Sequence, residues 1–236
     1  MWETARTLVY AVAIALAVRT FAYEPFNIPS GSMKPTLLVG DYLFVSKFAY
    51  GYSRHSFPFS LPLFEGRLLG RLPERGDVAV FKLPSDNSTD YIKRIVGLPG
   101  DELQVTDGTL YVNGEPAERV RLENFFDDDG SSNGALTRYR ETLPGGPSYT
   151  VLDLVAHGSL DNTDVYRVPA GHVFAMGDNR DNSLDSRVDS VGFIPIENLI
   201  GRAEIIFFST NGQARFWEIW NWPAAIRFTR LLNFIE

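Results

Sequence analysis

The sequence predicts a mainly β protein, with an antiparallel β-sheet domain that follows one N-terminal transmembrane helix. Three observations predict this fold class. An unbroken apolar run lies near the N-terminus, short β-branched or aromatic runs lie between turn residues further on, and no 3.6-residue period persists between Pro25 and Asn211. The chain has 236 residues and is 44% hydrophobic, which is enough for a substantial core.

The apolar run LVYAVAIALAV, extended to residues 5–23, reaches the ~20 residues that a bilayer-spanning helix needs. Arg19 lies near its end, where an arginine can reach the head groups, and Pro25 disfavours helix at Glu24, so we assign residues 1–24 to a membrane anchor. A cleaved signal peptide and a buried core helix are the alternatives. The A-x-A patterns lie inside the apolar run, where cleavage sites do not belong, so a retained anchor is favoured. The flanking charges do not set its orientation.

The middle of the chain contains the expected strands. The dipeptide Asp107-Gly108 predicts a hairpin turn between two of them. Segments 53–75 and 122–150 are expected to be loops, and the run of aspartates at 127–129 lacks the ligand spacing of a calcium loop, so no metal is expected there. The expected strands are 42–46, 78–82, 91–96, 103–105, 110–112, 165–168, 172–176 and 203–208.

Composition excludes several classes of function. The net charge of −7 argues against nucleic acid as a partner, because binding phosphates requires basic patches. The absence of cysteine excludes disulfides, thiolate metal sites and a cysteine nucleophile. The C-terminal segment, residues 216–236, combines three tryptophans with interleaved arginines. This composition favours contact with a membrane interface over a final helix packed on the core.

The segment Pro29-Ser30-Gly31-Ser32-Met33 presents two hydroxyls on a glycine-containing turn shortly after the apolar run. A serine becomes a nucleophile only when another group takes its proton. The histidines that could complete a Ser-His-Asp triad, His55, His157 and His172, do not lie in segments that resemble a catalytic loop. A lysine is the other known base for such a serine.

Lys93 is the lysine best placed for this role. Strand alternation puts Tyr91, Lys93 and Ile95 on one face, which is otherwise apolar, and desolvation there lowers the pKa of an ammonium. A decrease of about two units costs roughly 2.7 kcal/mol and raises the neutral fraction about a hundredfold. Lys34 is closer to Ser32 in sequence, but it precedes Pro35 on an expected loop, where it should stay solvated and charged. From these residues alone, a strand lysine that extends to solvent remains the alternative for Lys93.

Residues 177–187, GDNRDNSLDSR, form a third polar cluster. They contain three aspartates, two arginines and two serines, which indicates a hydrogen-bonded, salt-bridged loop that holds other groups in place, with a solvated surface loop as the alternative.

Together, these segments resemble the bacterial type I signal peptidase (leader peptidase) family, in order and over most of the chain. The resemblance rests on residues 23–26, 28–33 with 35–37, 40–41, 47–51, 75–78, 90–94 with 97–101, 177–187 and 222–230.

The resemblance implies a Ser-Lys dyad with Ser32 as nucleophile and Lys93 as general base. The Ser30 hydroxyl and the Ser32 backbone N–H would form the oxyanion hole, and Ser183 would orient Lys93. Supporting ion pairs would join Asp178 to Arg94 and Asp185 to Arg187. The candidate lining residues of small apolar substrate pockets are Phe26, Ile28, Met33, Leu37, Tyr91 and Ile92.

The implied substrate is a secretory preprotein, bound as an extended strand and cut after a small residue at an A-x-A-like site. The implied location is the bacterial inner membrane, with the catalytic domain on its outer face and the lipid bilayer as a partner. No metal or cofactor is implied. The expected catalytic β-domain comprises residues 25–106 and 173–215, and residues 107–172 would form a reduced accessory subdomain. The alternatives are another Ser-Lys peptidase and a non-enzymatic anchored β-domain that binds exported chains.

Overall fold

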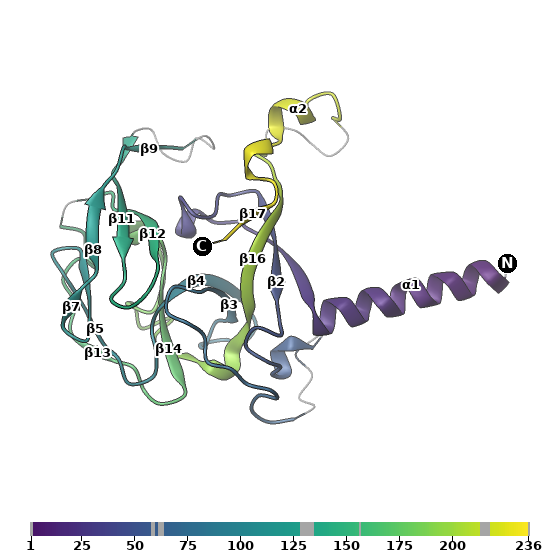
Figure 1. The fold of residues 1–236 in the computed structure, drawn as a ribbon, viewed down its shortest axis with the longest axis horizontal. Coiled ribbons are helices and arrows are strands. Elements are labelled where there is room, and N and C mark those ends of the chain that lie inside the picture. Colours follow the sequence, from purple (N-terminus) through teal and green to yellow (C-terminus); the bar gives the residue numbers. More distant parts are fainter. Residues whose placement is uncertain are drawn as a thin grey trace.

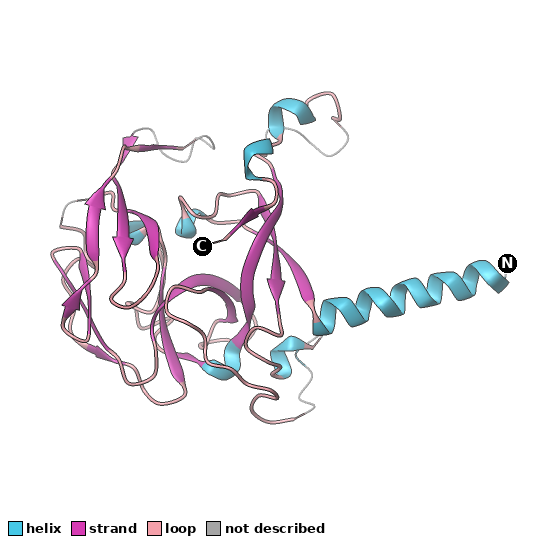
Figure 2. Cartoon of the chain, viewed as in Figure 1, coloured by secondary structure: helices cyan, strands magenta, loops and turns pink. Residues whose placement is uncertain are grey.

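A computed structural model of the chain describes residues 2–57, 60, 64–127, 135–155, 157–212 and 218–235. Strands dominate these residues, and a single long helix stands apart from them (Figure 2), so the predicted fold class is confirmed.

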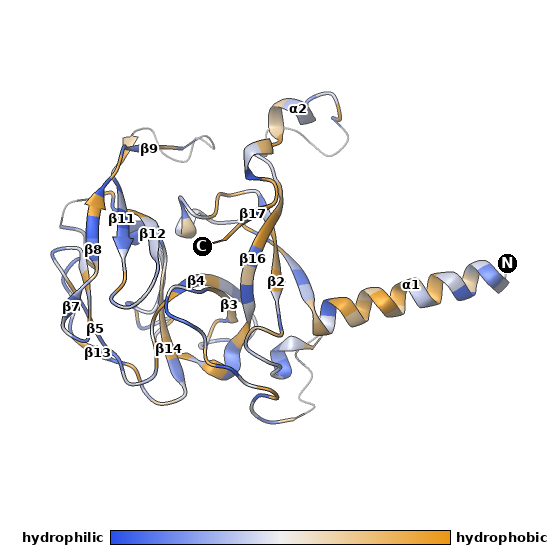
Figure 3. Ribbon diagram, in the orientation of Figure 1, coloured by the Kyte–Doolittle hydropathy of each residue, from blue (hydrophilic) through white to orange (hydrophobic). Residues whose placement is uncertain are grey.

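Helix α1 (Trp2–Phe21) projects from the β-structure as an isolated rod (Figure 1) and is mostly apolar along its second half (Figure 3). Within the described residues it is the one helix that is long and apolar enough to cross a bilayer, and only 6% of its apolar window is buried. A buried core helix is therefore wrong. The helix ends at Phe21, whose carbonyl accepts a hydrogen bond from the Tyr52 hydroxyl, and strand β1 begins two residues later. The helix end is thus joined directly to the β-domain.

The main sheet is antiparallel and curled, and it has the strand order β1-β2-β16-β3-β4-β14-β15, with β17 pairing the far part of β16. Its long central strand β16 pairs with both β2 and β3 (Figure 1). The curl brings the start of β4 opposite the turn that follows β1, because both line one groove. The strands are β1 Tyr23–Asn27, β2 Asp41–Ser46, β3 Val78–Lys82, β4 Asp90–Gly97, β14 His172–Met176, β15 Ile194–Pro195, β16 Leu199–Ser209 and β17 Asn233–Phe234.

Three smaller sheets form the side of the molecule away from α1 (Figure 1). The predicted hairpin at Asp107-Gly108 is confirmed, with both residues at positive φ. One sheet is β13 (Tyr166–Arg167), β5 (Glu102–Thr106), β6 (Thr109–Val112) and β7 (Glu115–Pro116). The others are β12 (Ser148–Leu152), β11 (Arg138–Thr142) and β8 (Glu118–Arg121), and β10 (Ala135–Leu136) with β9 (Phe125–Phe126).

The expectation of a loop over the whole of 122–150 is wrong, because β11 and the start of β12 fall inside it. These strands carry polar side chains at buried positions, above all Glu141, so their alternation does not show as an apolar pattern. Tyr149 and Val151 of β12 pack with Val96, Phe174 and Met176 of the main sheet, which joins the smaller sheet to the core beside the polar loop 177–187.

Candidate active site

Ser32 lies in a single 3₁₀ turn, Gly31–Met33, directly after β1 and the loop that follows it. Asn179 holds this turn: its backbone N–H donates to the Ser32 carbonyl at 3.0 Å, and its Nδ2 donates to the Gly31 carbonyl at 3.0 Å. Ser32 is 8% exposed. The nucleophile turn is therefore fixed by the polar loop, although 147 positions separate Ser32 from Asn179 in sequence.

Lys93 reaches Ser32 from strand β4. Its Nζ lies 2.8 Å from Ser32 Oγ and 2.9 Å from the Ile92 carbonyl, and the side chain packs near the Tyr91 ring. Lys93 is 4% exposed, and burial lowers its pKa from 10.5 to about 8, against the opposing effect of the Asp185 and Asp178 charges. An amine at this pKa is neutral in a useful fraction of molecules near neutral pH. The pair can therefore transfer a proton from hydroxyl to amine.

Two further serines lie beside the pair. Ser30 Oγ is 3.4 Å from Ser32 Oγ. Ser183 Oγ is buried and has no hydrogen-bond partner among the described residues, so the implied bond from Ser183 to Lys93 is not formed here. Gly177 is what lets Ser183 approach: a Cβ at position 177 would lie 2.2 Å from Ser183 Oγ and 2.6 Å from the Ser32 carbonyl oxygen.

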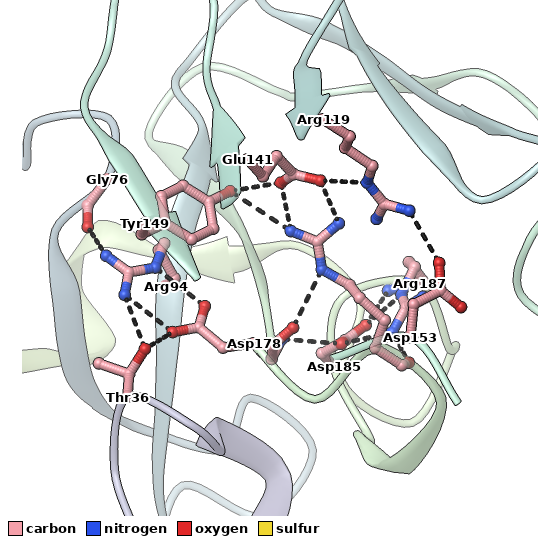
Figure 4. A network of polar contacts seen from close by, with 12 residues as sticks. Thr36, Gly76, Arg94, Arg119, Glu141, Tyr149, Asp153, Asp178, Asp185 and Arg187 are labelled. Atoms are coloured by element: carbon pink, nitrogen blue, oxygen red, sulfur yellow. Dashed lines mark hydrogen bonds and ion pairs between the residues drawn. The ribbon is translucent and has the colours of Figure 1, made fainter. Parts of the chain in front are cut away.

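Both implied ion pairs are present and buried (Figure 4). Arg94 donates to both carboxylate oxygens of Asp178, at 2.9 and 2.8 Å, and its guanidinium lies 4.0 Å from the centroid of the Tyr149 ring. Arg187 donates to both oxygens of Asp185, which also accepts the Gly177 N–H at 2.9 Å. These pairs fix the backbone on either side of Ser183.

Sequence reasoning missed a second buried cluster behind this loop. Glu141 accepts hydrogen bonds from Arg180, Arg119 and the Tyr149 hydroxyl (Figure 4). The Arg180 and Arg119 charges hold the pKa of the Glu141 carboxyl at about 2, below its usual range, despite complete burial. Glu141 thus anchors the polar loop to β11, and no sequence pattern links these partners.

The expectation that Lys34 stays solvated is wrong. Its side chain is 2% exposed, forms an ion pair with Asp127, and packs over Gly31, where an added Cβ would lie 3.2 Å from Lys34 Cε. Asp127 is the first aspartate of the run at 127–129, and its carboxylate pairs with Lys34. The neighbouring residues 128 and 129 lie outside the described residues.

A groove of about 790 Å³ opens over the dyad. Phe26, Ile28, Tyr91 and Ile92 line it, as expected. Met33 and Leu37 do not, because both are fully buried in the cluster that contains Ile28 and Val80, beneath the groove wall. Other lining residues that sequence reasoning missed are Ser159, Leu160, Asp181 and Leu184.

Two strand edges face this groove. In the described ladder, β1 pairs with β2 alone, and residues 90–93 of β4 pair with β3 alone, because the partners from β14 begin at Arg94. Unpaired backbone groups at a strand edge can accept an extended peptide as an added strand.

The described C-terminal residues form a short helix α2 (Trp222–Ala225) and strand β17, with exposed apolar side chains. Arg230 pairs with Asp41, and Arg227 donates to the Val39 and Thr210 carbonyls, so these two arginines face the domain. Trp217 lies outside the described residues. The exposed side chains include Ile219, Trp220, Trp222, Phe228, Leu232 and Phe234.

Comparison of the sequence with known proteins shows which family the chain belongs to. The sequence model described as "Signal peptidase, peptidase S26" matches residues 1–208. The chain belongs to the signal peptidase family, peptidase S26. A signal peptidase I of Rickettsia typhi is 44% identical over 209 residues, which cover 85% of this chain and 78% of that protein. A signal peptidase I of Rickettsia akari is 42% identical over 217 residues, which cover 89% of this chain and 79% of that protein.

A crystal structure of a signal peptidase I from Enterococcus faecalis is 25% identical, covers 56% of this chain and 97% of that chain, and superimposes with a TM-score of 0.32. The family and its curated relatives identify this member as a serine peptidase. The predicted resemblance and the prediction of an enzyme are both confirmed.

Proposed function

We propose that this protein is a membrane-anchored endopeptidase that removes signal peptides from exported preproteins with a Ser32–Lys93 dyad. The observation that carries the proposal is the 2.8 Å contact between Ser32 Oγ and a buried Lys93 Nζ whose pKa is about 8. When Lys93 is neutral, the Ser32 hydroxyl donates to Nζ, and Oγ can attack a carbonyl in the groove.

Acylation and deacylation each balance through two proton transfers. Lys93 takes the Ser32 proton as Oγ bonds to the scissile carbonyl carbon, and the resulting ammonium gives that proton to the leaving amine as the peptide bond breaks. Water then attacks the acyl-enzyme as Lys93 takes its proton, and the resulting ammonium gives that proton to Ser32 Oγ as the ester bond breaks, which frees the acid product and the Ser32 hydroxyl. The oxyanion would be held by the Ser32 backbone N–H and the Ser30 hydroxyl, whose position 3.4 Å from Ser32 Oγ supports this role. The remaining polar side chains around the dyad would have supporting roles, because they orient Lys93 or hold the loop that fixes the Ser32 turn. They are Ser183, Arg94, Asp178, Asp185 and Arg187.

The substrate would lie extended between the free edges of β1 and residues 90–93 of β4. The apolar side chains of Ile28 and Ile92 next to the dyad favour a small apolar residue before the scissile bond. The exposed apolar helix α1, joined directly to β1, supports a retained anchor that keeps the groove beside the bilayer. We assign this bilayer to the bacterial inner membrane, with the catalytic domain on its outer face.

The test is cleavage of a purified preprotein by the full chain in detergent or vesicles. We expect two products whose masses place the cut after a small residue of an A-x-A-like site, and no cleavage by Ser32→Ala. Binding of the preprotein without cleavage would instead favour a non-enzymatic receptor. Cleavage of this chain itself, with the preprotein intact, would favour a self-cleaving Ser-Lys peptidase.

A further inference from the structure

A second cavity, of about 190 Å³, adjoins the catalytic groove at the end of the anchor helix. Phe26 and Asp90 line both spaces, so the two are neighbours. Ionisable side chains dominate the wall of this second cavity, in contrast to the apolar wall beside the dyad. They are Arg19, Glu24, Lys47, His55, Lys82 and Asp90.

Both strand edges that face the groove run from the dyad to this cavity. Along β4, Asp90 lies three positions before Lys93, which is a distance of about 10 Å at ~3.3 Å per residue. A peptide paired to this edge, with its scissile bond at Ser32, therefore reaches the cavity about four to six residues upstream of the cut. That part of the peptide lies between the active site and the helix end, where a membrane-inserted segment would begin.

The charges in the cavity are unequal. Glu24 pairs with Arg19 at 2.7 Å and with Lys47 at 2.8 Å, and Asp90 pairs with Lys82 at 2.7 Å. Three cations thus face two carboxylates. His55 adds no charge near neutral pH, because burial, together with the charges of Arg54, Lys82 and Arg67, lowers its pKa to about 4. The side chains of Lys82 and Asp90 are 16% and 42% exposed, so this pair can open to admit another polar group.

We propose that this cavity is an upstream subsite that accepts an acidic or neutral polar side chain four to six residues before the scissile bond and disfavours lysine or arginine. This inference rests on the proposed function, and it adds a charge-based preference to the small-residue preference at the cut.

The experiment compares versions of one preprotein that carry Glu, Gln or Lys at each of these three upstream positions in turn. For the wild-type full chain, we expect kcat/KM to fall in the order Glu, Gln, Lys at one or more of them, with Glu about tenfold above Lys at low salt. The ratio should shrink as salt is added, because the pairs are partly exposed.

Two variants of the protein should shift the ratio of kcat/KM for the Glu preprotein to that for the Lys preprotein in opposite directions. Lys82→Glu should lower the Glu-to-Lys ratio at least about threefold, and Asp90→Asn should raise it by a similar factor, so the inference stays testable if one variant fails to fold. Arg167→Glu is the matched control, because Arg167 pairs with Glu102 on β5, a strand of the separate four-stranded sheet, and its side chain is 79% exposed. It should leave the ratio unchanged.

Cleavage at equal rates for all substitutions would overturn the subsite while leaving signal peptide removal intact, whereas absence of any cleavage would overturn the proposed function first. Equal rates combined with a loss of binding to phosphatidylglycerol vesicles, relative to phosphatidylcholine, in Lys82→Glu alone would assign the cavity to a lipid head group and also overturn the subsite.

Discussion

The pKa of Lys93 predicts the pH dependence of the reaction. With a pKa of about 8, roughly one Lys93 in ten is neutral at pH 7, compared with roughly one in 3,000 at the ordinary value of 10.5. Because the base acts only when neutral, kcat/KM should rise about tenfold per pH unit below pH ~7 and level off above pH ~8.5. Burial at 4% exposure is the physical reason for this early plateau.

The assay is the initial rate of preprotein cleavage at substrate concentrations well below KM, from about pH 6 to pH 10. Lys93→Arg is the matched variant, because it keeps a long cation but its guanidinium stays protonated throughout this range. We expect that kcat/KM of Lys93→Arg does not increase with pH over this range. A wild-type profile that is flat below pH ~8, or that keeps rising to about pH 10.5, would refute the argument from desolvation.

Three further predictions concern single residues. Lys93→Met should raise the free energy of unfolding at pH 7 by up to about 3 kcal/mol, because the lowered pKa of Lys93 destabilises the folded state below pH ~8; chemical denaturation should show that gain disappear as the pH rises from about 8 to 10.5. Ser30→Ala should lower kcat about 10²–10³-fold with KM little changed, as measured by steady-state kinetics; an unchanged kcat would remove Ser30 from the oxyanion hole. Lys34→Met should destabilise the fold by about 3–5 kcal/mol, because it removes a cation from the buried Asp127 carboxylate, and adding Asp127→Asn should recover part of the loss in thermal unfolding; full additivity of the two changes would contradict the pairing.

The sequence was most informative where a short local pattern was sufficient to determine the local structure. Strand alternation placed Lys93 on an otherwise apolar face and left a solvent-reaching side chain as the alternative, and in the structure Lys93 is buried. The pattern Asp-Gly predicted the hairpin between β5 and β6. The apolar run predicted a helix long enough to span a bilayer, although it ends at Phe21, three residues before the expected boundary.

Features that depend on distant partners could not be predicted in the same way. Lys34 is buried because Asp127, 93 positions away, supplies a carboxylate. Strand β11 was missed because its buried side chain is Glu141, whose charge is compensated by Arg180 from another segment. Met33 resembles a pocket residue in sequence, but the turn that exposes Ser32 to the groove directs the next side chain into the core.

The central claim is that Ser32 and Lys93 act as one unit, and a double-mutant comparison tests it most directly. On one preprotein, Ser32→Ala and Lys93→Ala should each reduce cleavage by at least about 10³-fold, and the double variant should be no slower than either single variant. Loss factors that multiply in the double variant, or near-normal cleavage by Lys93→Ala, would contradict the dyad.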